Sequence, residues 1–180
     1  MKLIESKTLG TAQTAIEFTS IPSTFTDLVF LCSLRSNRTA DVQENVRVSF
    51  NGSTSGYSER LLYGTGSGAA SLSGSGSYFN FAVYSATAGA TSNTFNNTML
   101  YIPNYAGSTN KSISTDNVTE NNATAAFQSI QAGLWSNTAA INSVAFTVGF
   151  AEFATTLQAG STISLYGILK GSDGIVTTSP

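Results

Sequence analysis

The chain has 180 residues, of which 10% are charged and 41% hydrophobic, and its formal net charge is −2. This length suits one domain with its own core, and the hydrophobic share is too high for a disordered chain. The sequence has no histidine and a single cysteine, Cys32, which excludes a histidine-based catalytic triad, a histidine zinc site and an internal disulfide. The sparse, slightly acidic charge argues against nucleic-acid binding, and no apolar run is long enough for a membrane span.

Polar uncharged residues dominate the rest of the composition. Serine, threonine and asparagine supply 26, 24 and 14 residues. Their side chains compete for backbone hydrogen bonds, so they are unfavourable inside helices and common in turns, while threonine also suits strands. The composition therefore predicts an all-β protein with hydroxyl- and amide-rich surfaces.

Short strand patterns follow one another along the chain. Alternating or dense apolar residues predict strands at residues 3–8, 15–21, 27–34, 46–50, 78–84, 98–103, 128–134, 144–150 and 161–169, with one weak strand within 111–122. Residues 57–63 fit either a strand or a short helix. Asn51-Gly52 predicts a tight hairpin turn, because both residues tolerate positive φ. Residues 64–76, rich in glycine and serine, and residues 86–97 are expected to be surface loops.

The number and spacing of these segments predict the architecture. Roughly eight to eleven strands with short connections and no long helix are typical of an antiparallel two-sheet sandwich. A jelly roll with long Gly/Ser/Asn loops is the form we expect. One β-sandwich domain should span residues 1–170, and residues 171–180 should form a loose C-terminal tail.

No motif in the sequence points to catalysis or metal binding. A glycosidase would need two of the ten scattered acids to face each other, and the sequence leaves this alternative open, although solvated edge charges explain the acids more simply. The oxygen-rich segments 41–45 and 116–122 could bind calcium, but they lack the spacing of a calcium loop, and polar loops are the simpler interpretation. Cys32 is expected to be a buried structural residue. We expect no enzymatic activity, no cofactor and no metal site.

Some arginines and aromatic residues are candidates for protein contacts. Arg35, Arg38, Arg47 and Arg60 lie close together in sequence and could form a basic patch for a negatively charged protein surface, although scattered solubilising charges explain them equally well. Trp135 and the tyrosines could line a carbohydrate platform, but core or subunit-contact positions are the usual place for such residues. The candidate protein-contact residues are therefore Arg35, Arg38, Arg47, Arg60 and Trp135.

Several segments together resemble a group of small tailed-phage virion proteins. The chain carries DLVF at residues 27–30, RVSFNG at 47–52, a tyrosine at 57 and STISLYG at 161–167. The resemblance covers residues 1–170 as a pattern of strands, and RVSFNG and STISLYG are its sharpest parts. It implies a jelly-roll capsid cement (decoration) protein, or a related tail or fibre component. Proteins similar to it are non-enzymatic and commonly form trimers that clamp neighbouring capsid subunits.

The composition is compatible with this resemblance. A cement protein needs stiffness, solubility and an adhesive underside, which would be an exposed apolar and aromatic patch. We therefore expect a homotrimer on the capsid surface of a virion, with the phage major capsid protein as partner and neither nucleic acid nor membrane as ligand. The aromatic- and loop-rich composition keeps a receptor- or glycan-binding fibre head as the alternative, and a polysaccharide-degrading enzyme as a third.

Overall fold

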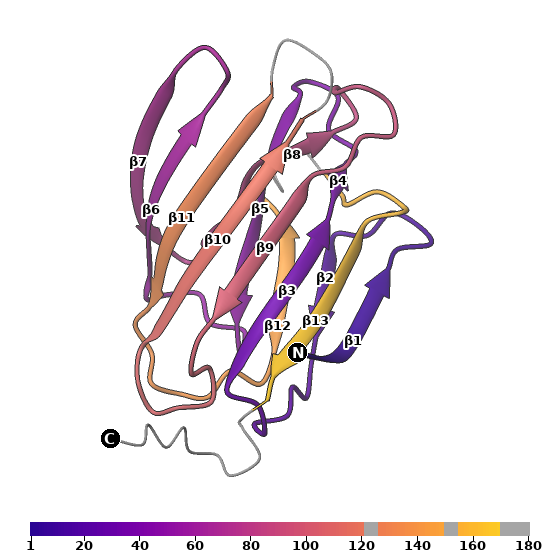
Figure 1. The fold of residues 1–180 in the computed structure, drawn as a ribbon. Coiled ribbons are helices and arrows are strands. Elements are labelled where there is room, and N and C mark those ends of the chain that lie inside the picture. Colours follow the sequence, from indigo (N-terminus) through magenta and orange to yellow (C-terminus); the bar gives the residue numbers. More distant parts are fainter. Residues whose placement is uncertain (121–125, 150–154, 170–180) are drawn as a thin grey trace, which may run out of the picture.

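The computed structural model describes residues 1–120, 126–149 and 155–169, which form a two-layer β-sandwich (Figure 1). Every regular element in these residues is a β-strand. The strands are β1 (Lys2–Thr8), β2 (Ala15–Phe18), β3 (Asp27–Ser33), β4 (Arg35–Ser36), β5 (Gln43–Phe50), β6 (Tyr57–Gly64), β7 (Ala69–Gly76), β8 (Phe79–Thr87), β9 (Asn97–Ile102), β10 (Lys111–Thr119), β11 (Phe127–Trp135), β12 (Val144–Val148) and β13 (Thr162–Ile168). No helix long and apolar enough to cross a membrane occurs among the described residues.

The two sheets differ in width. The large sheet has the order β1-β13-β3-β9-β10-β11-β6-β7, and the small sheet has the order β2-β12-β5-β8-β4. Apart from the short parallel pair of β4 and β8, neighbouring strands run antiparallel. The prediction of an all-β, antiparallel two-sheet sandwich is confirmed, and the arrangement is consistent with the jelly-roll type. The expected tail, residues 171–180, lies outside the described residues.

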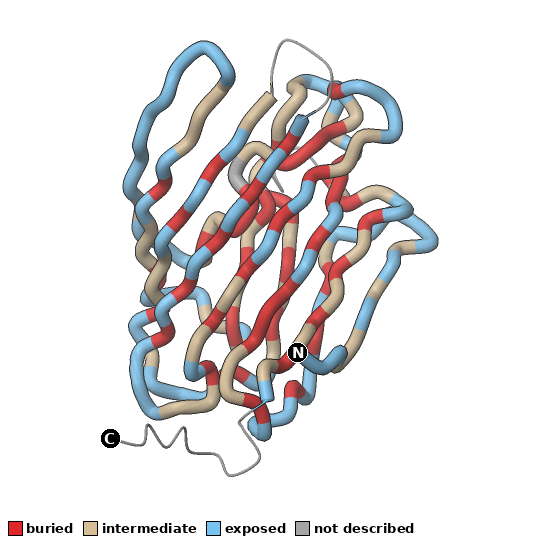
Figure 2. Tube along the Cα trace, viewed as in Figure 1, coloured by how far each residue is buried: buried red, intermediate tan, exposed pale blue. Residues whose placement is uncertain are grey.

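The core lies between the sheets, and buried residues recur at alternate positions along many strands (Figure 2). Strand β5 shows the cause most clearly, because its buried and half-buried residues alternate along all eight positions. Phe146 of β12 packs edge-on against Phe18, Phe30 and Phe81, with ring centroids 6.3, 5.2 and 5.1 Å away. Cys32 is buried as predicted, and burial raises the pKa of its thiol.

The Asn51-Gly52 turn forms, but the hairpin predicted from it is wrong. Both residues have positive φ, 52° and 67°. The turn leads from β5 in the small sheet to β6 in the large sheet, so the two strands do not pair. The Asn51 side-chain oxygen accepts hydrogen bonds from the backbone N–H groups of Asn142 and Ser143 at 2.9 and 3.1 Å. A tight turn therefore serves here as a link between the two layers.

The expected loop at residues 64–76 is instead largely the strand β7. It pairs with β6 without interruption, from the pair of Tyr57 with Gly76 to the pair of Gly64 with Ala69. The prediction failed because most of β7 is exposed on both faces, so its sequence carries no apolar alternation. The ambiguous residues 57–63 belong to the strand β6, which settles them as β rather than helix.

Strand β10 was expected to be weak, yet it spans nine residues in the middle of the large sheet. Its buried positions include the polar residues Thr115, Asn117 and Thr119, so the buried face of the strand does not show as a run of alternating apolar residues in the sequence. Asn117 accepts hydrogen bonds from Asn96 and Thr98 at 3.0 and 2.5 Å. Buried polar side chains of this kind are tolerated because they satisfy one another.

Candidate interaction surface

The large sheet packs one face on the small sheet and presents its other face, the outer face, to solvent. Cross-strand pairing lines up exposed apolar side chains on this outer face. Leu31 pairs with Met99, and Ile130 pairs with Leu62, while Asp116 lies between Met99 and Ile130. The four apolar residues are 41–53% exposed. This row crosses five neighbouring strands, a distance of about 20 Å at the usual strand spacing.

A second row lies two residues away from the first on β3 and β9, and extends from there onto β13 and β1. Leu3 pairs with Tyr166, Tyr166 with Val29, and Val29 with Tyr101. The Tyr101 hydroxyl donates a hydrogen bond to the Asp27 carboxylate at 2.9 Å. Burial, reinforced by this hydrogen bond and by the negative charge of Asp27, raises the pKa of Tyr101. The hydroxyl is thus held in its neutral, donating form.

We call the two rows together the apolar band; the exposed Asp116 interrupts it between Met99 and Ile130. Its members are Leu3, the buried Val29, Leu31, Leu62, Met99, Tyr101, Ile130 and Tyr166. Single exposed apolar residues are ordinary, but several gathered on one face of a sheet are typical of a binding face. The sequence shows these residues at alternate strand positions, but not that they share rows, because strand register is set only in the folded sheet.

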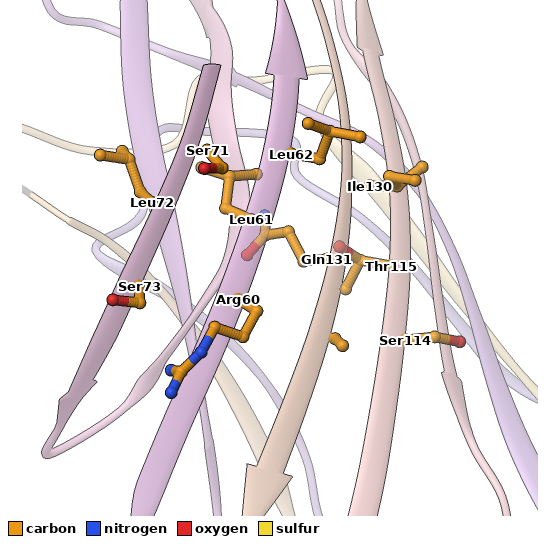
Figure 3. A pocket seen from close by; sticks show the side chains of 11 residues that line it. Arg60, Leu61, Leu62, Ser71, Leu72, Ser73, Ser114, Thr115, Ile130 and Gln131 are labelled. Atoms are coloured by element: carbon orange, nitrogen blue, oxygen red, sulfur yellow. The ribbon is translucent and has the colours of Figure 1, made fainter.

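The apolar band borders a hollow over strands β10, β11, β6 and β7. The hollow has a volume of about 810 Å³, and its lining includes Arg60, Leu62 and Ile130. Figure 3 shows Leu62 and Ile130 on neighbouring strands, with Arg60 further along the same strand as Leu62. The Arg60 guanidinium is exposed and donates to the carbonyl of Glu59 at 2.8 Å. The outer face therefore offers an apolar floor with one accessible positive charge beside it.

The structure does not gather the four arginines into one patch. Arg47 lies on the outward side of β5 in the small sheet, with its guanidinium carbon 3.9 Å from the ring centroid of Tyr78. Arg60 lies on the outward side of the large sheet, on the opposite side of the sandwich. Arg38 pairs with Asp41 at 3.7 Å. Of the four, Arg60 is the one that adjoins the apolar band, and a protein-contact role for each stays a prediction.

Arg35 and Trp135 are buried, at 5% and 1% exposure. The Arg35 guanidinium donates to the carbonyls of Ala90, Thr91 and Thr94 at 3.1, 2.9 and 2.6 Å. Burial lowers the pKa of Arg35. These contacts supply a structural reason for Arg35, because its positive charge organises the loop after β8. A direct contact with a partner stays a prediction for both residues.

Trp135 belongs to an aromatic cluster of the core. Its ring stacks on Tyr57 with a centroid distance of 6.1 Å and an interplanar angle of 15°, and it lies 5.5 Å from the ring of Phe50. The Tyr57 hydroxyl accepts a hydrogen bond from the backbone N–H of Phe50 at 2.8 Å. The cluster therefore joins β5, β6 and β11, on either side of the Asn51-Gly52 turn.

The oxygen-rich segments weighed as calcium sites have other surroundings. Asp41 accepts a hydrogen bond from the backbone N–H of Val42 at 2.7 Å and pairs with Arg38. Asp116 lies at an exposed position within strand β10 rather than in a loop. Residues 121 and 122 of the second segment lie outside the described residues. In the part of the chain that the structure describes, no group of three or more Cys, Asp or Glu side chains could hold a metal ion.

A third aromatic group lies where β6, β8 and β11 approach one another. Tyr84 stacks on Phe127 with a centroid distance of 4.5 Å and an angle of 22°, and its ring lies 4.9 Å from that of Tyr63. All three side chains are half-buried. Tyr84 has φ of 68°, which is unusual for a bulky residue, and burial, with a contribution from Tyr63, raises its pKa to about 12.

Comparisons with known proteins add little to this geometry. No protein-family model matches the chain, and no curated protein sequence matches it significantly. Among solved structures, the chain is similar to one described as the crystal structure of HCR/D-Sa-GBL1/C, with 11% identity and a TM-score of 0.24. The match covers 94% of this chain and 45% of that one. At this TM-score the likeness carries no argument about fold or function.

Proposed function

We propose that this protein is a non-enzymatic phage virion component, a capsid cement protein that binds the major capsid protein shell as a homotrimer. The observation that carries the proposal is the apolar band on the outer face of the large sheet. A cement protein requires an exposed apolar and aromatic patch on a stiff support, and this band provides both. The proposal also rests on the resemblance of the RVSFNG and STISLYG segments to small virion proteins.

The setting of the apolar band suits adhesion to a repetitive surface. Hydrogen-bonded strands hold its side chains in fixed positions, so little conformational freedom is lost on binding. Hydroxyls such as those of Ser6, Ser164 and Ser114 surround it and keep the free protein solvated. A trimer would bring three such bands to the shell together, so each contact needs only modest affinity.

Cosedimentation with undecorated capsid shells of the parent phage tests this proposal. The wild-type chain should bind, and Ile130→Lys should weaken binding roughly tenfold or more, because it places a charge on a surface that must lose water. Leu169→Lys is the matched control, since Leu169 is 57% exposed and lies outside the apolar band. Binding by Ile130→Lys as tight as that of the wild type would contradict the proposal.

The mass of the free protein tests the oligomeric part of the proposal. Light scattering of the free protein at high concentration should report three times the 18.8 kDa chain, or a multiple of that mass where trimers associate further. A specific trimer needs interfaces of roughly 1,200 Å² or more between its chains. A chain that stays monomeric both free and on the shell would refute the trimer.

The half-buried aromatic group of Tyr63, Tyr84 and Phe127 favours one alternative, a tail or fibre component that binds a receptor or glycan. Aromatic faces stack on sugars, and a strained backbone such as that of Tyr84 is often retained for a functional reason. Glycan-array binding that disappears in Tyr84→Ala but persists in Ile130→Lys would favour this alternative over the cement proposal.

A further inference from the structure

Strand β7 forms one edge of the large sheet and is an unusually unprotected edge (Figure 1). An edge strand presents unpaired backbone N–H and C=O groups, and natural proteins normally protect such edges with charges, prolines, bulges, short strands or a covering segment. The β7 sequence, AASLSGSG, contains neither charge nor proline. Its eight pairs with β6 run without a register shift, and seven of its eight residues are exposed (Figure 2).

The other three edges of the sandwich carry the usual protection. Strand β1 bears the ion pair between Glu5 and Lys7, at 3.3 Å, and its pairing with β13 contains a register shift. Strand β2 has only four residues, and the Lys7 ammonium covers its Glu17 carbonyl at 2.5 Å. Strand β4 has two residues, and Ser36 forms a bridge with Leu157. Within residues 1–120, 126–149 and 155–169, the contrast singles out β7 as the edge left free to add a strand.

We infer that β7 pairs with β7 of a second copy of this chain across a two-fold axis, so that the large sheets of two molecules become continuous. An antiparallel pair places directly opposite residues on the same face of the sheet. We place the two-fold axis at Leu72. Leu72 then lies opposite Leu72 of the second copy, Ser71 opposite Ser73, and Ala70 opposite Gly74.

The chemistry of β7 favours its own copy as the occupant. Leu72 is 53% exposed, although its partner on β6, Leu61, is only 5% exposed. In the two-fold register the two Leu72 side chains cover each other on the side where Leu61 is buried, which removes apolar surface from water. The remaining side chains are small and uncharged, so identical strands approach without charge repulsion.

This contact is independent of the proposed function. A two-fold pairing does not close a trimer, so it would join trimers to one another rather than build them. Leu72 lies outside the apolar band, on the opposite face of the sheet from Leu62. The inference and the shell-binding proposal can therefore fail separately.

Cysteine cross-linking tests the pairing. Under mild oxidation, Leu72→Cys should form a covalent dimer, because directly opposite Cα atoms in an antiparallel pair lie about 4.5–5.5 Å apart, within disulfide reach. Ser75→Cys is the matched control, since in this register the two cysteines would be about 20 Å apart and should stay uncoupled. The native Cys32 is buried and should not contribute.

A charge variant provides the second measurement. Leu72→Lys should raise the dissociation constant of the pair roughly tenfold or more in sedimentation equilibrium, because two lysines would lie directly opposite each other. Leu62→Lys, at the same 53% exposure on the neighbouring strand, should leave the pair intact. A chain in which Leu72→Cys does not cross-link, or in which Leu62→Lys disrupts association as strongly as Leu72→Lys, would overturn the inference.

Discussion

Replacement of Arg35 by methionine should destabilise the fold, whereas the same change at Arg60 should not. Arg35→Met keeps the aliphatic stem but removes the donors to three carbonyls, those of Ala90, Thr91 and Thr94. The bond to Ala90 is buried, so this carbonyl loses its partner at a cost of about 1–3 kcal/mol. The other two bonds are partly buried, and water can replace part of them, at a cost of roughly 0.5–1 kcal/mol each.

The sum predicts that Arg35→Met lowers the free energy of unfolding by about 2–5 kcal/mol. For a chain of this length, such a loss corresponds to a fall in Tm of about 4–20 °C. Thermal unfolding followed by circular dichroism, with urea unfolding as a second measure, would record it. Arg60→Met should stay within about 0.5 kcal/mol of the wild type, because the Arg60 side chain is exposed.

The comparison separates a structural arginine from a contact arginine. Lysine at position 35 should give an intermediate loss, since it keeps the charge but cannot reach the three carbonyls with a planar fork of donors. A Tm for Arg35→Met within about 1 °C of the wild type would refute the reasoning, because it would show that the loop after β8 does not depend on these hydrogen bonds.

Two further changes have clear expected outcomes. Gly133→Ala should destabilise the folded protein by about 1–3 kcal/mol, because the new Cβ would lie 2.5 Å from the buried ring of Phe79. Gly68→Ala is the control and should change Tm little, because open space surrounds Gly68. Equal effects of the two changes would contradict this packing. Stability should fall as pH rises from 10.0 towards about 12, because Tyr84 keeps its proton in the folded chain after the unfolded chain has lost it. Tyr84→Phe should flatten this fall in Tm measured across that pH range, and an unchanged slope would contradict the assignment.

The sequence predicted the fold class well because local periodicity survives in many strands. In β5 and β13 the alternation of residue types along the sequence indicates which side chains face the core. This can be read without knowing which strands lie next to them. Strand β7 escaped prediction because neither of its faces packs on a core. Strand β10 was underestimated because Thr115 and Asn117 are polar yet buried, and the hydrogen-bond partners of Asn117, Asn96 and Thr98, come from elsewhere in the fold.

The candidate surface was less predictable than the fold. The apolar band depends on register between strands that are far apart in sequence, such as Leu31 with Met99, and register is fixed by the packing of the whole core. Nearness in sequence was equally misleading for the arginines. Arg47 and Arg60 belong to consecutive strands, but the Asn51-Gly52 turn sends those strands to different sheets, so the two charges face opposite directions.

The position of β13 has a consequence for how the chain is made. Strand β13 lies between β1 and β3, and the Ser164 hydroxyl contacts that of Ser6 across 158 residues of sequence. While the nascent chain leaves the ribosome, β1 cannot pair with its neighbour until residues 162–168 have been synthesised. Assembly that depends on such distant partners is slow and exposes unpaired edges meanwhile. A polypeptide terminated before Thr162 would leave β1 and β3 separated by an empty place, so this sheet becomes continuous only once β13 has emerged.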